Sequence, residues 1–167
     1  MSDDKAIPVT NLQVIKPSRK VLQGGDIFVL HPRSRGYFFG RVVRTDAKIR
    51  YMTPTNLVYL FAIESDSKTP PARLSAMQLL IPPLMTNRLP WSRGYFETVA
   101  HRGFEPGERL PVHCFRDWAF KRYERYWDDE ERELSKRREP CGVYGLHSFL
   151  TIDVAVSNAL GIPRASD

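Results

Sequence analysis

Four histidines and two cysteines carry the side chains best suited to acid–base, nucleophilic or metal chemistry near neutral pH. Such chemistry needs two or more of these groups at short spacing or brought together in space. No histidine has another histidine or a cysteine two, three or four positions away. The sequence therefore predicts no catalytic residue, no metal ligand and no cofactor. The residues concerned are His31, His101, His113, His147, Cys114 and Cys141.

His113 directly precedes Cys114, and this pair is the strongest candidate for nucleophilic catalysis. Adjacent residues on a strand point to opposite faces, so this imidazole is not expected to activate the thiol. A hydrolase would need His113, Cys114 and Asp117, or His147 with a distant carboxylate, to converge in one pocket. We expect buried thiols at both cysteines and keep a hydrolase as one alternative function.

A strongly basic stretch lies between residues 33 and 50. The chain has 25 Lys and Arg against 19 Asp and Glu, and the net charge of +6 favours an acidic partner surface or a phosphate backbone. Within the stretch, aromatic residues alternate with six basic residues and a single acidic one. Arginine and aromatic residues are common both at protein interfaces and on single-stranded nucleic-acid platforms. We predict a partner-binding face that includes Arg33, Arg35, Tyr37, Arg41, Arg50 and Tyr51.

A run of four acidic residues forms the second charged feature: Asp128, Asp129, Glu130 and Glu131. Clustered carboxylates can bind a divalent cation, but this run lacks the alternating ligands and the glycine of a calcium loop. The pattern favours a solvated hairpin tip. If this tip takes part in partner binding, it should meet a basic patch on the partner.

Strand and turn patterns dominate the first half of the chain. Residues 26–31 and 37–45 are apolar, β-branched runs separated by the turn residues 32–36, and they predict a β-hairpin. Alternation places one set of aromatic residues of the second arm in the core. A further strand is expected near 57–63, after a connection over 46–56 that contains a proline turn signal.

The C-terminal segment predicts a helix near residues 151–160. Thr151 is a candidate N-cap, apolar residues recur every fourth position, and Gly161 follows as a stop. The fold class expected is α+β and β-dominated: a curled antiparallel sheet or small barrel with a C-terminal helix. Three aromatic residues are expected to join the same core: Phe115, Trp118 and Phe120.

The chain is short enough for a single domain. The apolar residues of segment 1–22 follow neither a helical nor a strand periodicity. We therefore expect a flexible N-terminal arm followed by one domain over 23–167. No apolar run approaches 18 residues, and the acidic start Met1–Lys5 is unlike a signal peptide. We therefore expect no membrane span and a cytoplasmic location.

Several short motifs together resemble the immunity protein 26 family, which consists of bacterial proteins encoded beside polymorphic toxins. The family pattern begins with a GDIF motif, continues through a Gly-Tyr pair and closes with an aromatic-Gly-Arg-Val strand. The likeness extends over roughly residues 23–162. The matching segments are Gly25–Phe28, Gly36–Tyr37, Phe39–Val42, Leu57–Ala62, Arg125–Asp128 and Val143–Phe149.

The resemblance implies a single immunity-type domain that neutralises a cognate toxin domain in bacterial competition. It implies non-catalytic occlusion of the toxin and a protein partner. Separately, we expect the chain to be a monomer or weak dimer. Two alternatives remain open: a nucleic-acid-binding module built on a small barrel, and the hydrolase. We expect a protein partner rather than a nucleic acid. A continuous basic groove with exposed aromatic rings would favour the nucleic-acid module.

Overall fold

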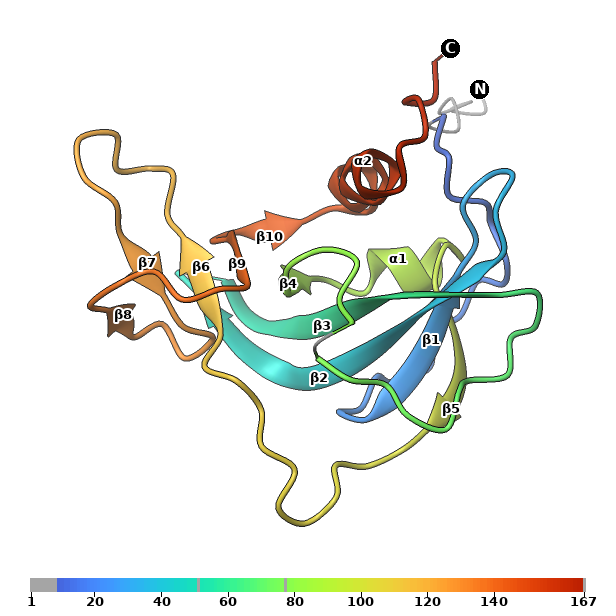
Figure 1. Cartoon of the computed structure of the whole chain (residues 1–167), viewed down its shortest axis with the longest axis horizontal. Helices are drawn as coiled ribbons and strands as arrows, with labels where there is room; N and C mark the ends of the chain where they lie inside the picture. The colour runs from blue at the N-terminus through green and yellow to red at the C-terminus, as the bar shows by residue number, and fades with distance from the viewer. Residues whose placement is uncertain (1–8, 51, 77, 167) are drawn as a thin grey trace, which may run out of the picture.

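The computed structural model describes residues 9–50, 52–76 and 78–166, and within them the chain forms two β-sheets and two helices (Figure 1). In spatial order the large sheet contains β10 (Leu146–His147), β4 (Leu84–Thr86), β3 (Met52–Ser65), β2 (Tyr37–Ile49), β1 (Asp26–Leu30) and β5 (Glu97–His101). The small sheet contains β8 (Glu133–Leu134), β7 (Tyr126–Trp127), β6 (Cys114–Arg116) and β9 (Cys141–Val143). The helices are α1 (Leu89–Ser92) and α2 (Phe149–Leu160).

The predicted β-dominated fold with a curled sheet and a C-terminal helix is confirmed. Both sheets are open, because each begins and ends on an unshared edge strand, so the barrel form of the prediction is not the one found. The sheets are also mixed rather than purely antiparallel. Strand β10 runs parallel to β4, and β6 runs parallel to β9, while the other neighbouring strands are antiparallel.

The predicted hairpin forms from β1 and β2, with Phe28 opposite Gly40. The Phe28 ring packs on Phe96 at 4.6 Å and on Trp91 at 5.0 Å between ring centroids. A Cβ atom at position 40 would lie 2.2 Å from the Phe28 ring. Position 40 therefore needs glycine, because any side chain there would displace the ring that fills the core.

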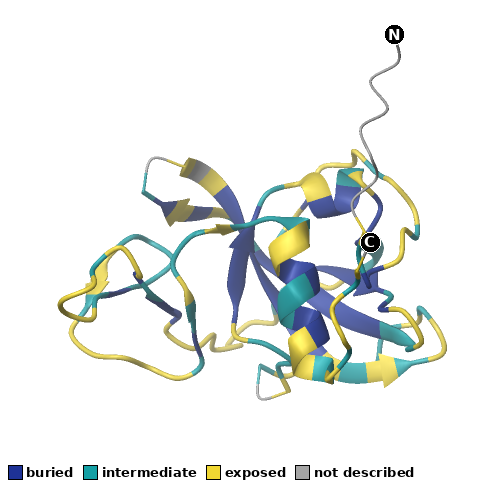
Figure 2. Ribbon diagram, turned by 90° about the horizontal axis from the view of Figure 1, so that it is seen from above, coloured by how far each residue is buried: buried dark blue, intermediate teal, exposed yellow. Residues whose placement is uncertain are grey.

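The large sheet is covered on both faces, so both sets of residues on β2 are buried. Phe38 and Val42 belong to the core that also contains the buried residues Ile152 and Val156 of α2, and Figure 2 shows buried segments along this helix where it lies over the sheet. Phe39 faces a second core on the opposite side, which Phe115 of β6 also enters. Phe38 and Phe39 are therefore both buried, one in each core, whereas the sequence pattern required burial of one set of aromatic residues; Tyr37 is only partly buried.

Strands β2 and β3 extend through the region where we expected a connection. The pairing continues to Ile49 opposite Met52, so residues 46–50 and 52–56 belong to the long hairpin. The register shifts between Ala47 and Ile49, where β3 has an extra residue around Pro54. Because prolines are tolerated at such bulges, Pro54 bends the strand instead of ending it.

Helix α2 begins two residues earlier than predicted. Ser148 has an extended backbone and its hydroxyl accepts a hydrogen bond from the Thr151 amide, so Ser148 and not Thr151 is the N-cap. The helix ends as predicted at Leu160, followed by Gly161 with φ +67°. Leu160 packs on the core together with Ile152.

The described part of the expected N-terminal arm packs against α2. The Leu12 amide donates to the Asp153 carboxylate at 2.7 Å, and the Asn11 amide group donates to Ser157 at 2.8 Å. Asn11 and Leu12 are both buried. Residues 9–22 therefore lie on the domain, and residues 1–8 are outside the described part of the chain.

The central place of Phe28 gives a stability prediction. We expect Phe28→Ala to lower the free energy of unfolding by about 3 to 5 kcal/mol, because it removes a fully buried ring and leaves a cavity between two other rings. Val21→Ala is the control, since Val21 is 71% exposed, and it should cost less than about 0.5 kcal/mol. Urea denaturation measures both, and a cost below about 1 kcal/mol for Phe28→Ala would contradict this packing.

Candidate partner-binding site

The acidic run forms the predicted hairpin tip, but the tip is not freely solvated. Strands β7 and β8 pair on either side of it, and the Arg132 carbonyl accepts from the Asp128 amide. The tip lies against β2, where Arg44 forms ion pairs with Asp129 and Glu130. Lys48 adds a further pair to Glu130. Part of the basic stretch therefore pairs with part of the acidic run within the molecule.

Asp129 also ends a buried hydrogen-bond chain that crosses between the sheets. The Tyr59 hydroxyl lies 2.6 Å from Nε2 of His113, and Nδ1 of the same ring lies 3.0 Å from the Asp129 carboxylate. Burial raises the pKa of the Tyr59 hydroxyl, so it stays protonated at neutral pH. We call this chain the Tyr59–His113–Asp129 link.

The charges around Asp129 decide its ionisation. Burial alone would raise the pKa of this carboxyl, but the hydrogen bond and charge of His113 and the bond from Arg44 outweigh it. Together they lower the pKa of Asp129 to about 2. The carboxylate is therefore fully ionised at neutral pH and strengthens the contact between the hairpin tip and β2.

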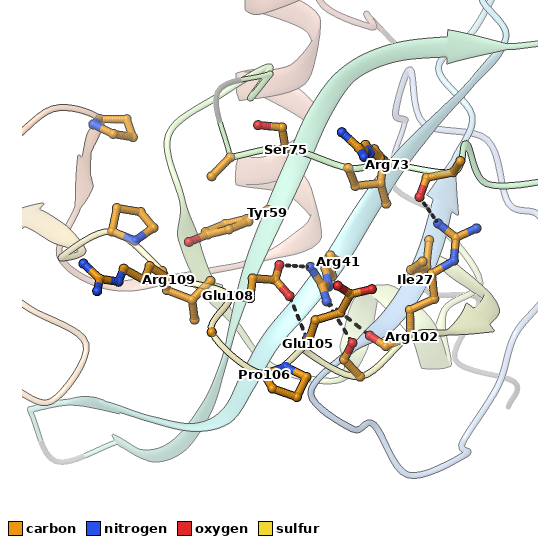
Figure 3. A pocket seen from close by; sticks show the side chains of 18 residues that line it. Ile27, Arg41, Tyr59, Arg73, Ser75, Arg102, Glu105, Pro106, Glu108 and Arg109 are labelled. Atoms are coloured by element: carbon orange, nitrogen blue, oxygen red, sulfur yellow. Dashed lines mark hydrogen bonds and ion pairs between the residues drawn. The ribbon is translucent and has the colours of Figure 1, made fainter.

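Arg41 is buried, contrary to the expectation that it lies on an exposed binding face. Its guanidinium pairs with Glu108 at 2.8 Å and stacks over the Phe104 ring at 4.0 Å. Figure 3 shows the ion pair of Arg41 and Glu108 in the lining of a pocket of about 1110 Å³, beside Tyr59 and Arg102. The hydrogen bond from Arg41 lowers the pKa of Glu108, so the pair stays charged. Arg41 thus fastens the loop after β5 to the sheet.

Three other predicted residues lie together near the turn between β1 and β2. Arg35 makes a bidentate contact with Glu64, Tyr37 stacks against His31 at 4.5 Å, and Arg33 is exposed. This group remains a candidate binding face. Tyr51, the last residue of the predicted basic face, lies outside the described residues.

Arg50 lies at the far end of β2, in a cluster of arginine and aromatic residues that the sequence analysis did not identify. Its guanidinium pairs with the buried Asp117 at 3.2 Å. It also lies within 6.0 Å of the ring centroids of Phe120, Trp127 and Tyr144. We call the cluster the arginine–aromatic surface; its members are Arg50, Arg125, Phe120, Tyr123, Trp127 and Tyr144.

Trp118 was expected in the core, and this prediction is wrong. The Trp118 side chain is 58% exposed, whereas Phe115 on the neighbouring strand β6 is fully buried. The Arg116 guanidinium lies 3.7 Å from the Trp118 ring and gives it a stacking partner outside the core. The sequence signal that could have indicated an exposed Trp118 is the close spacing of arginine and aromatic residues over 116–127.

The groups considered for a hydrolase do not converge. His113 faces Tyr59 and Asp129, while Sγ of Cys114 lies 3.2 Å from Sγ of Cys141. Both cysteines are buried free thiols, as predicted. Within residues 9–50, 52–76 and 78–166, no cluster of three or more His, Cys, Asp or Glu side chains is arranged to hold a metal ion. No helix in this described part is long and apolar enough to cross a membrane.

The fold and these surfaces define a β-dominated α+β domain. Stacked arginine and aromatic side chains lie on the smaller of its two curled sheets. The sequence model of the family described as immunity protein 26 matches residues 23–125, and the chain belongs to that family. The match includes the large-sheet strands β1 to β5 and the first strand of the small sheet. No curated protein and no solved structure matches the chain.

The contact at Asp129 gives a prediction about acid stability. We expect Asp129→Asn to lower the free energy of unfolding by about 3 kcal/mol at pH 7, because Arg44 and His113 would lose a partly buried charged partner. The pKa of Asp129 is about 2 in the folded chain against an ordinary value of 3.8. Its stabilisation is therefore fully present above about pH 4 and is lost as the pH falls through 2.

Urea titrations of both proteins between pH 7 and pH 2.5 test this expectation. The difference between wild type and Asp129→Asn should be constant down to about pH 4 and then shrink. Asp46→Asn is the matched control, because Asp46 pairs with the same Arg44 but its side chain is 73% exposed. Its cost should stay below about 1 kcal/mol. An equal loss of unfolding free energy in the two variants would contradict the stabilising role of the Asp129 contacts with Arg44 and His113.

Proposed function

We propose that this protein binds a cognate bacterial toxin domain and neutralises it by non-catalytic occlusion. The observation that carries the proposal is the match to the immunity protein 26 family over residues 23–125. A protein of this kind needs affinity, specificity and charge complementarity, and it needs no turnover. We further propose that it acts in the cytoplasm as a monomer or weak dimer, with a single domain over residues 23–167 against which residues 9–22 pack.

The state of the ionisable groups supports a binding function without catalysis. His113 is held between Tyr59 and Asp129 inside the protein, where both ring nitrogens already have partners. Burial and the neighbouring Cys114 raise the pKa of the Cys141 thiol to about 12, so it stays protonated and is a poor nucleophile. The net charge of +6 favours approach to an acidic toxin surface.

The test is a titration of the purified chain against the toxin domain encoded beside its gene. Occlusion predicts a 1:1 complex by calorimetry and by size-exclusion chromatography with light scattering. It also predicts that cells expressing the toxin survive when the chain is co-expressed, and that toxin recovered from the complex keeps its intact mass. Cells that carry the empty vector are the control.

Two results would contradict this proposal. Protection by far less than one chain per toxin, with a changed toxin mass, would indicate an enzyme that modifies the toxin. Tight RNA or DNA binding that falls steeply with salt, in the absence of any toxin complex, would instead favour the nucleic-acid module.

A further inference from the structure

The pocket beside Arg41 is a cleft whose floor is one row of residues across three strands. In the strand register Ile27 of β1 lies opposite Arg41 of β2, and Arg41 lies opposite Tyr59 of β3. Residues directly opposite one another in antiparallel strands share a face of the sheet, and all three of these are buried. The walls come from segments 72–76 and 102–111. We call this pocket the basic cleft.

The two walls of the basic cleft are joined to each other and to its floor. Arg102 donates from Nη1 to the carbonyl of Pro71 at 2.6 Å and to that of Ala72 at 3.3 Å. Arg41 donates from Nη2 to the Arg102 carbonyl at 3.2 Å, and its ion pair with Glu108 holds the same wall at a second point. These contacts set the shape of the cleft before a partner arrives, so little ordering entropy is lost on binding.

Positive charge prevails in the basic cleft. Arg73 and Arg109 are exposed, and within the described residues neither has an ion pair or a side-chain hydrogen bond. Arg102 contacts only neutral carbonyls, whereas the Arg41–Glu108 pair is neutral as a whole. Three arginines are therefore left opposite one glutamate. The charged lining residues are Arg41, Arg73, Arg102, Arg109, Glu105 and Glu108.

Apolar side chains form much of the remaining lining. Leu74 lies on one wall and Leu110, which is 41% exposed, on the other. Binding sites commonly combine an apolar lining with a few charged groups that fix orientation. The volume of about 1110 Å³ exceeds the range of about 300 to 1,000 Å³ that is usual for small-molecule sites. The cleft therefore has room for several side chains of a protruding segment.

This lining fits a protein segment better than a nucleic acid. Nucleic-acid bases bind by stacking on open aromatic faces. Among the described residues that line the cleft, Tyr59 is the one aromatic residue; it is 3% exposed and its hydroxyl is engaged with His113. A base would find no open ring there. Acidic side chains interspersed with apolar ones would complement both the arginines and the apolar walls.

From these observations we propose that the basic cleft is the docking site for a protruding loop of the cognate toxin domain that carries acidic and apolar side chains. This inference rests on the proposed function. Figure 3 shows Arg109 on the Tyr59 side of the cleft and Arg102 on the Ile27 side, so positive charge is available at both ends. The candidate face around Arg35 and the arginine–aromatic surface do not line this cleft.

A steric test fills the cleft without removing any charge. A Cβ atom at Gly103 or at Gly145 would meet no atom within 4 Å, so neither position requires glycine. Gly103 lines the cleft and Gly145 does not. We expect Gly103→Trp to weaken affinity for the purified toxin domain at least about 100-fold, because the indole would occupy space that the loop needs. The matched control Gly145→Trp should change affinity less than about threefold in the same calorimetric titration.

A second test reverses the unpaired charges of the cleft. The double variant Arg73→Glu with Arg109→Glu should slow association and weaken affinity at least about 100-fold. The control is Arg19→Glu with Arg33→Glu, which reverses two other exposed arginines and changes the net charge equally. This control should weaken affinity less than about tenfold, because it alters only long-range attraction.

The outcomes separate this inference from the proposed function. Thermal unfolding checks the folding of each variant, and the exposed charge reversals remain a probe if Gly103→Trp is unstable. If the wild type binds the toxin but the cleft variants bind it no more weakly than their controls, the docking site is wrong and the proposed function stands. If the wild type binds no toxin, both fail. Salt-steep RNA binding that Gly103→Trp abolishes would overturn the protein partner.

Discussion

The buried link from Tyr59 through His113 to Asp129 determines where the small sheet lies on the large one. Tyr59 is on a central strand of the large sheet, His113 immediately precedes β6, and Asp129 is at the tip of the next hairpin. The link therefore holds β6 at one end and the β7–β8 hairpin at the other. Because β6 also pairs with β9, the link connects to every strand of the small sheet, and Phe115 of β6 adds apolar packing against the large sheet.

Internal pairing of charges explains why the basic stretch does not form a continuous groove. Arg44 contacts the acidic tip, and Arg41 fastens the loop that carries Glu108. A charged group that is taken out of water is stable only with a close partner, so these arginines serve the packing of the chain. The exposed positive charge of this stretch is left at the two ends of β2. This division gives two separate candidate faces where the sequence indicated one.

The sequence predicted the elements whose signals are local. The apolar, β-branched run over 37–45 predicted a strand, and the four-residue spacing of Ile152, Val156 and Leu160 predicted α2. The pairing of Arg44 with Asp129 joins residues 85 positions apart, and no local pattern specifies it. Trp118 was misplaced for a related reason. Tryptophan is usually buried, so burial was expected for Trp118. The neighbouring Arg116 guanidinium instead stacks on the indole and stabilises it at the surface.

The large sheet provides most of the packed core, whereas the small sheet carries surface side chains that could contact a partner. The large sheet contains the two longest strands, β2 and β3, and is packed on both faces, and Phe115 of β6 adds to one of its two cores. The strands of the small sheet are two or three residues long, and such short strands supply few backbone hydrogen bonds. Side-chain contacts must therefore hold the small sheet, and stacked arginines supply them at its surface. Substitutions there can alter the shape and charge offered to a partner without disturbing the core of the large sheet, which is the arrangement that a specific binding protein requires.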